Sequence, residues 1–183
     1  MRKFKYILIY LLVFSFVVVL LLSRSHFILR SNVTTYINKI YKQEMSIKSD
    51  SEFSYKDNNY RIIFSTPVNK KDELYVQCFQ EKFNGLVYIP TYGSAQGKSK
   101  SLCNMINHFL NNANGDSFYV VYGYNKNFKA STFSVEKSTD GTLITEDISK
   151  KEYFLNTYTD ITYGKITFKD ANNNDISPFF YGQ

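Results

Sequence analysis

The stretch with the most suggestive chemistry is TYGSAQGKSKS, residues 91–101. A phosphate-binding P-loop needs four residues between its two glycines, so that successive backbone N–H groups surround a phosphate while the following lysine reaches across it. Here Gly93 and Gly97 enclose only three residues. The spacing argues against a nucleotide site, and no nucleotide is expected as a partner.

A weaker anion site is compatible with the same stretch. The apolar residues that follow Leu102 recur at helical spacing, and Ser99 or Ser101 could cap a helix that begins there. The N-terminal backbone N–H groups of such a helix would face an anion together with the neighbouring lysines. We therefore expect either a weak anion site at Lys98, Ser99 and Lys100 or a plain Gly/Ser loop that leads into the helix.

The two cysteines, Cys78 and Cys103, are the next candidates. A thiol nucleophile needs a base within hydrogen-bond reach. On the expected helix, Cys103 and His108 point to different faces, which disfavours catalysis by this pair. If the domain is exported, Cys78 and Cys103 could form a disulfide worth about 3 kcal/mol. Two buried free thiols are an equal alternative.

The stretch from Asp170 to Asp175 resembles the first half of a calcium loop. Asp170, Asn172 and Asn174 place oxygen-bearing side chains at positions 1, 3 and 5. Asp175 then stands where the loop needs glycine, and Tyr181 where it needs a bidentate glutamate. This is a weak calcium candidate beside the plainer interpretation, an Asn-rich turn. No other metal and no cofactor is expected.

Three segments beyond the N-terminus have apolar residues at the three- and four-residue spacing of a helix: 29–40, 70–83, and from 102 to the Asn114-Gly115 stop. The second is ambiguous, because Leu74 to Phe79 could equally form a strand.

The remaining segments predict strands. Phe53–Asp57 and Tyr60–Phe64 flank Asn58-Asn59 and predict a hairpin. Further strands are expected at 86–90, 118–124, 131–137, 142–148, 153–157 and 161–169. Both alternating faces of 118–124 are apolar, as in a central strand buried on both sides. The sum is an α+β fold: an antiparallel sheet of about five to seven strands with one or two packed helices.

The N-terminus carries a membrane signal. From Tyr6 to Leu22 the only residue that is neither apolar nor aromatic is Ser15. As a helix these 17 residues would measure about 26 Å, slightly short of the hydrocarbon core of about 30 Å. We expect a transmembrane helix retained as a signal anchor. The alternative is a cleaved signal peptide, although Ser23-Arg24-Ser25 is a poor cleavage site.

The net charge of +6 belongs mostly to this segment. Five of the six charges fall in the first 30 residues, and the remaining chain holds 17 basic and 16 acidic residues. The domain thus has no excess positive charge to collect phosphates, so no nucleic acid is expected as a partner. Basic residues flank both ends of the apolar run. Because a long domain can translocate regardless of its charge, we expect it to be extracytoplasmic.

The expected organisation is a basic tail (1–5), a transmembrane helix (6–22), a helical stalk (23–50) and an α+β domain (53–183). The abundance of Lys, Asn and Ile is typical of a low-GC bacterial genome. Without paired carboxylates or a metal cluster, the sequence favours a binding or assembly module of the cell envelope over an enzyme. Its expected partners are the membrane and another envelope protein or a cell-wall polymer. An exported cell-wall hydrolase and a pilin-like subunit are the alternatives.

Overall fold

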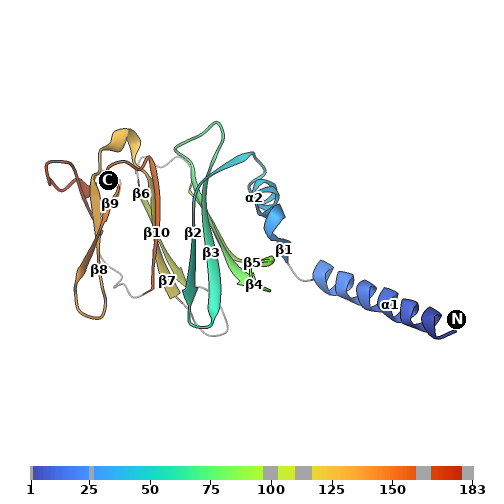
Figure 1. The fold of residues 1–183 in the computed structure, drawn as a ribbon. Coiled ribbons are helices and arrows are strands. Elements are labelled where there is room, and N and C mark those ends of the chain that lie inside the picture. Colours follow the sequence, from blue (N-terminus) through green and yellow to red (C-terminus); the bar gives the residue numbers. More distant parts are fainter. Residues whose placement is uncertain (1, 25–26, 97–102, 110–116, 160–165, 179–183) are drawn as a thin grey trace.

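A computed structural model describes residues 2–24, 27–96, 103–109, 117–159 and 166–178, with the backbone alone described at 2–5, 18–24, 92–96, 103–109 and 117. Figure 1 shows the arrangement. The elements are α1 (Arg2–Arg24), β1 (Ile28–Leu29), η1 (Arg30–Asn32), α2 (Val33–Tyr41), β2 (Met45–Tyr55), β3 (Asn58–Pro67), β4 (Leu74–Lys82), β5 (Val87–Gln96), β6 (Cys103–Phe109), β7 (Ser117–Tyr124), η2 (Lys126–Phe128), β8 (Thr132–Glu136), β9 (Leu143–Asp147), β10 (Tyr153–Tyr158) and β11 (Thr167–Lys169).

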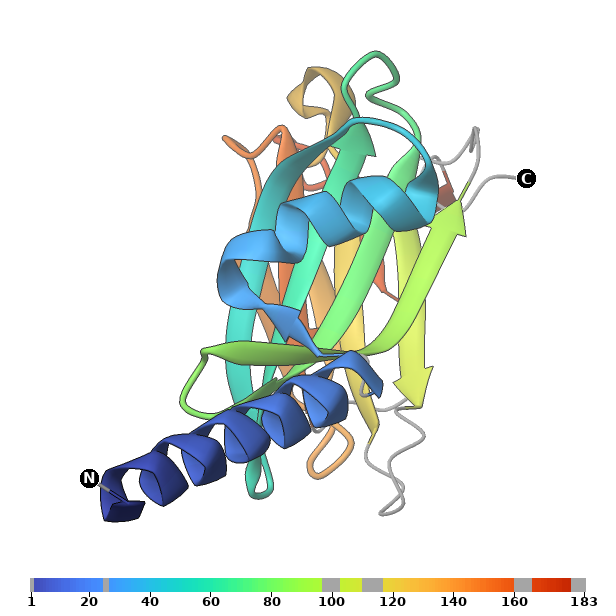
Figure 2. The same cartoon turned by 90° about the vertical axis from the view of Figure 1, so that its right-hand side faces the viewer.

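The strands of the described residues form three sheets, and all of their described pairings are antiparallel. Sheet A has the order β1-β5-β4-β3-β2, sheet B the order β10-β7-β6 and sheet C the order β11-β8-β9. The sheets follow one another as layers, and α2 covers the outer face of sheet A (Figures 1 and 2). The α+β class and the antiparallel pairing are confirmed. The expectation of a single sheet is wrong, because the strands divide among three layers.

Strand β7 holds the layers together. Phe118, Val120 and Tyr122 belong to the core between sheets A and B. The intervening Tyr119 and Val121 belong to the core between sheets B and C. The prediction of a central strand buried on both faces is therefore confirmed.

Helix α2 closes the outer face of sheet A. Val33 and Ile37 are buried in one cluster with Phe79 and Tyr88 of the sheet, while Ile40 on the same helix is 40% exposed. The helix expected at 29–40 is present from Val33 to Tyr41 and lies against the domain, whereas Leu29 belongs to β1 and Arg30–Asn32 form η1. The stalk expected at 23–50 is not present, because β1, α2 and the first part of β2 are built into the domain.

The helix predicted for 70–83 is wrong. Residues 74–82 form β4, which pairs with β3 on one side and β5 on the other. Leu74, Val76 and Cys78 face sheet B, whereas Tyr75 and Phe79 face α2. A strand buried on both faces has no polar side, so its residues satisfied the helical template by coincidence.

The helix predicted from Leu102 is wrong as well. Residues 103–109 form β6, paired with β7 from Cys103 opposite Gly123 to Phe109 opposite Ser117. Pairing with a strand that follows later in the chain overrides the local pattern.

The hairpin prediction is confirmed, with the turn at Lys56-Asp57, two residues earlier than expected. Tyr55 lies opposite Asn58, and Lys56 in the turn takes the left-handed backbone conformation, with φ of 51°. The strands expected at 86–90, 131–137, 142–148 and 153–157 correspond to β5, β8, β9 and β10. Of 161–169, the structure describes β11, and residues 160–165 lie outside the described part.

Helix α1 projects away from the layered domain (Figure 1). The large apolar residues between Tyr6 and Val17 are all exposed, by 44 to 71%. Among the described residues, no helix combines the length and apolarity needed to cross a membrane.

The packing of α2 gives a matched pair of variants. Ile37→Ala removes a fully buried side chain and should lower the free energy of unfolding by about 2–5 kcal/mol. Ile40→Ala, one turn along the same helix, should cost under about 1 kcal/mol, because its side chain is largely outside the core. Urea unfolding of the full chain measures both. Equal losses would show that α2 does not cover sheet A through Ile37.

Candidate functional site

A pocket of about 340 Å³ opens where the three sheets come together. Its residues come from β2 of sheet A, the end of β10 of sheet B, and the β8–β9 hairpin of sheet C. They are Phe53, Ser54, Lys137, Ile144, Thr157, Tyr158 and Thr159. Because β2 and β10 are edge strands of their sheets, the pocket lies beside two strand edges rather than on a sheet face.

The aromatic walls of the pocket are fixed by packing. Phe53 stacks on Tyr60 at 5.6 Å between ring centroids and meets Phe118 edge-on at 4.8 Å. Beside it, Ser51 and Thr157 share a hydrogen bond of 3.3 Å between their hydroxyl oxygens across β2 and β10. The strands on two sides of the pocket are therefore tied to each other as well as to the core.

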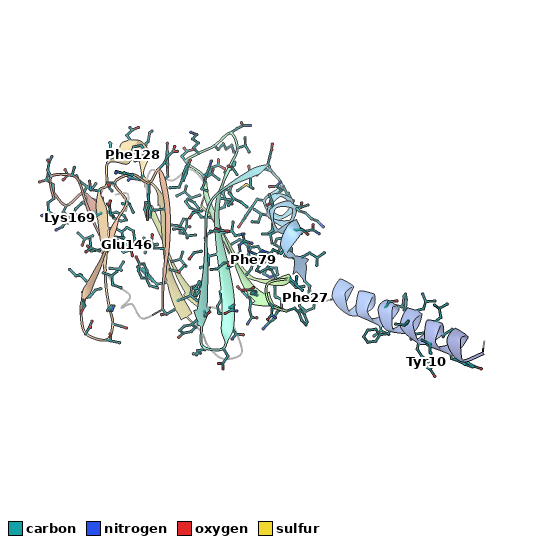
Figure 3. All side chains as sticks on the ribbon, viewed as in Figure 1. Tyr10, Phe27, Phe79, Phe128, Glu146 and Lys169 are labelled. Atoms are coloured by element: carbon teal, nitrogen blue, oxygen red, sulfur yellow. The ribbon has the colours of Figure 1, made fainter. Side chains whose placement is uncertain are left out.

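Tyr158 links the pocket to sheet C. Its hydroxyl donates to Oε1 of Glu146 on β9 at 3.4 Å; Figure 3 shows Glu146 on sheet C. Burial, followed by the negative charge of Glu146 and its hydrogen bond, raises the pKa of Tyr158 above its usual range. The phenol is therefore neutral at physiological pH and acts as a hydrogen-bonding group.

The lining of the pocket offers few ionisable groups. Among the seven lining residues only Lys137 and Tyr158 have ionisable side chains, and Tyr158 stays protonated. A general acid–base pair would need two groups whose pKa values lie near the working pH. Aromatic faces, three hydroxyl side chains and one ammonium group instead suit a hydroxylated ligand that carries negative charge.

The anion site expected at Lys98, Ser99 and Lys100 falls outside the described residues. Its physical basis was a helix N-terminus directly after the loop. Since residues 103–109 form β6, that basis is missing. Gly93 lies in β5 opposite Gln77 and not in a loop.

Of the two cysteines, the structure describes only the side chain of Cys78. It is 1% exposed and faces the core between sheets A and B. Burial raises the pKa of Cys78 to about 12. The side chains of Cys103 and His108 lie outside the described part, so the disulfide between Cys78 and Cys103 stays a prediction.

The calcium candidate forms a turn closed by its own hydrogen bonds. Oδ1 of Asp170 accepts the backbone N–H groups of Asn172 at 2.9 Å and Asn174 at 2.8 Å, and Oδ2 accepts the side-chain amide of Asn174 at 3.0 Å. These bonds, led by the one from the Asn174 side chain, lower the pKa of Asp170. Asn174 thus turns a donor toward the carboxylate. Throughout the described ranges, no three His, Cys, Asp or Glu side chains gather as a metal site.

The pocket residues were not identified from the sequence. Phe53, Lys137 and Tyr158 lie at least 21 positions apart in the sequence and carry no shared motif. They come together only because the three sheets stack, and no short sequence pattern predicts how sheets stack.

No family model, curated protein or solved structure matches this chain. Its function therefore has to be inferred from the geometry above.

The burial of Cys78 predicts its reactivity. In a Cys103→Ser variant, the thiolate of Cys78 should be only about 10⁻⁴ of the total at pH 8, given its pKa of about 12. Folded protein should therefore resist alkylation by iodoacetamide, and unfolding in urea should expose the thiol to it. Rapid alkylation of the folded variant would contradict the burial of Cys78. Alkylation of the native chain before and after reduction separately tests the disulfide.

Proposed function

We propose that this chain is a membrane-anchored binding module of the bacterial cell envelope, with α1 inserted in the bilayer and the layered domain outside the cytoplasm. The observation that carries the proposal is the exposure of large apolar side chains on every side of α1 between Tyr6 and Val17. A helix that is apolar all round is stable only when something apolar surrounds it. Lipid meets that requirement in every direction at once.

The domain does not supply that cover. The three buried clusters contain residues from α2 and the sheets but none from the described part of α1. The one hydroxyl in the apolar run, on Ser15, donates to the carbonyl oxygen of Leu12 at 3.0 Å. Its polar hydrogen is thus satisfied within the helix, as the interior of a bilayer requires.

The pocket between the three sheets supports the proposal that the domain binds a ligand. Phe53 and Tyr158 present ring surfaces and Lys137 presents positive charge, while the side chains of Ser54, Thr157 and Thr159 complete the lining. We propose an anionic cell-wall polymer as the ligand: a chain of hydroxylated units that bear phosphate or carboxylate groups. The ammonium group would pair with the anionic groups of such a polymer, and the aromatic rings would pack against its hydroxylated units, without chemical change.

Membrane insertion can be tested by alkaline carbonate extraction of cells that express the full chain. The native chain should stay with the membranes. Leu12→Arg combined with Val13→Arg should release it, because each charge near the centre of a membrane helix costs about 2.5–3.5 kcal/mol. Val13→Leu is the matched control and should stay in the membranes. Release of the native chain would overturn the anchor.

The same cells test the orientation. Protease added to intact cells should degrade the domain, while a cytosolic marker protein stays whole. A protected domain that becomes sensitive only after lysis would refute the extracytoplasmic placement and leave the anchor intact.

The pocket proposal depends on Lys137. Lys137→Gln should weaken binding to purified anionic wall polymer by about tenfold or more, since a hydrogen bond to a charged group contributes about 1.5–3 kcal/mol. Lys126→Gln, an exposed lysine on η2, is the control and should leave affinity unchanged. Co-sedimentation at low and high salt measures both. Equal affinities for the two variants would exclude Lys137 from the binding site.

A further inference from the structure

Besides the exposed apolar residues of α1, an apolar surface lies at the end of the domain next to this helix. Leu29, Phe83 and Leu86 are exposed by 56, 67 and 68%. Together with Arg30, Ser31 and Val87 they line an open hollow of about 790 Å³. Elsewhere in the described part of the domain, exposed large apolar residues occur singly on separate elements: Ile40, Ile47, Val68, Phe128 and Leu143.

The turn that carries Phe83 is held in an unusual conformation. Phe83 and Asn84 both have φ of 53°, and Gly85 follows with φ of 79°. A bulky residue such as Phe rarely adopts left-handed backbone angles, and such strain persists where the surrounding structure enforces it. A Cβ atom at Gly85 would collide with the carboxylate of Glu81 and crowd Arg30. The result is a tight turn whose aromatic ring is largely exposed to solvent.

This turn is joined to the segment that leaves α1. Leu29 of β1 pairs with Val87 of β5, and the backbone N–H of Arg30 donates to the carbonyl oxygen of Leu86 at 3.1 Å. Phe27 meets Phe83 edge-on, with ring centroids 6.5 Å apart. Figure 3 shows Phe27 at the junction between α1 and the domain.

Chain length limits how far this surface lies from the anchor. Helix α1 ends at Arg24, and Leu29 follows five positions later in the sequence. A fully extended chain of that length reaches about 18 Å at most. The polar interface on each side of a bilayer is several ångströms deep, so the surface stays within reach of the headgroups.

We propose that Phe27, Leu29, Phe83 and Leu86, the juxta-anchor patch, insert into the interfacial layer of the bilayer that holds α1. This inference deepens the proposed function and depends on its membrane anchor. Aromatic side chains favour that layer. Beside the patch, the guanidinium of Arg30 lies 3.5 Å from the carboxylate of Glu52 in an exposed ion pair. The domain is then docked against the membrane with sheet C, the layer remote from α1, facing outward (Figure 1).

The chain contains no tryptophan, so single introduced tryptophans can report where each position lies. Tyr10→Trp probes α1, Phe83→Trp and Leu86→Trp probe the patch, and Phe128→Trp probes an exposed residue at the far side of the domain (Figure 3). Each full-length variant is reconstituted in phosphatidylcholine–phosphatidylglycerol vesicles with and without brominated lipid. Bromine quenches tryptophan emission at short range.

The patch proposal predicts loss of emission in brominated vesicles for Tyr10→Trp, Phe83→Trp and Leu86→Trp, with a blue shift at the patch, and no loss for Phe128→Trp. If Tyr10→Trp is quenched while both patch variants match Phe128→Trp, docking is overturned and the anchor stands. If Tyr10→Trp is not quenched, the anchor fails, and the docking that depends on it is overturned with it. Equal quenching of all four would refute an oriented patch.

Discussion

Strand β7 has to bury both of its faces, and the rest of the domain is arranged to meet that requirement. Phe118 and Tyr122 on one face need sheet A, while Tyr119 and Val121 on the other need sheet C. A two-layer domain would leave one of these faces in water, at a cost of about 25 cal/mol for each Å² of apolar surface. Three stacked sheets are the arrangement that covers both.

Stacking also needs loops that carry the chain from one layer to the next without leaving buried polar groups unpaired. Between sheets B and C, Asn125 at the end of β7 supplies hydrogen bonds to the buried backbone of such loops. Its side-chain amide is fully buried; Nδ2 donates to the carbonyl oxygens of Ala130 and Ile148, and Oδ1 accepts the N–H of Ala130. Leaving such groups unpaired would cost about 1–3 kcal/mol each. The residue clamps the start of β8 and the end of β9 to the central strand.

The surface features follow from the same layering. The pocket exists because the edges of three sheets come together without a shared ladder, and Phe53 and Tyr158 are left as its walls. At the opposite side of sheet A, the β4–β5 turn and β1 leave Phe83 and Leu86 beside the segment that follows α1. The proposed binding site and the proposed membrane contact thus occupy different elements, so a domain docked on lipid would keep its pocket accessible.

The sequence alone determined the features that depend on local chemistry. Continuous apolarity marked the N-terminal helix, the turn near Asn58 marked the β2–β3 hairpin, and dual alternation marked β7 as a central strand. Tertiary structure decided the rest. Residues 74–82 and 103–109 became strands because their hydrogen-bonding partners lie elsewhere in the chain, and a short apolar run buried on both sides carries no period that separates helix from strand. The pocket could not be predicted either, because its residues come together through the stacking of the sheets and are not neighbours in the sequence.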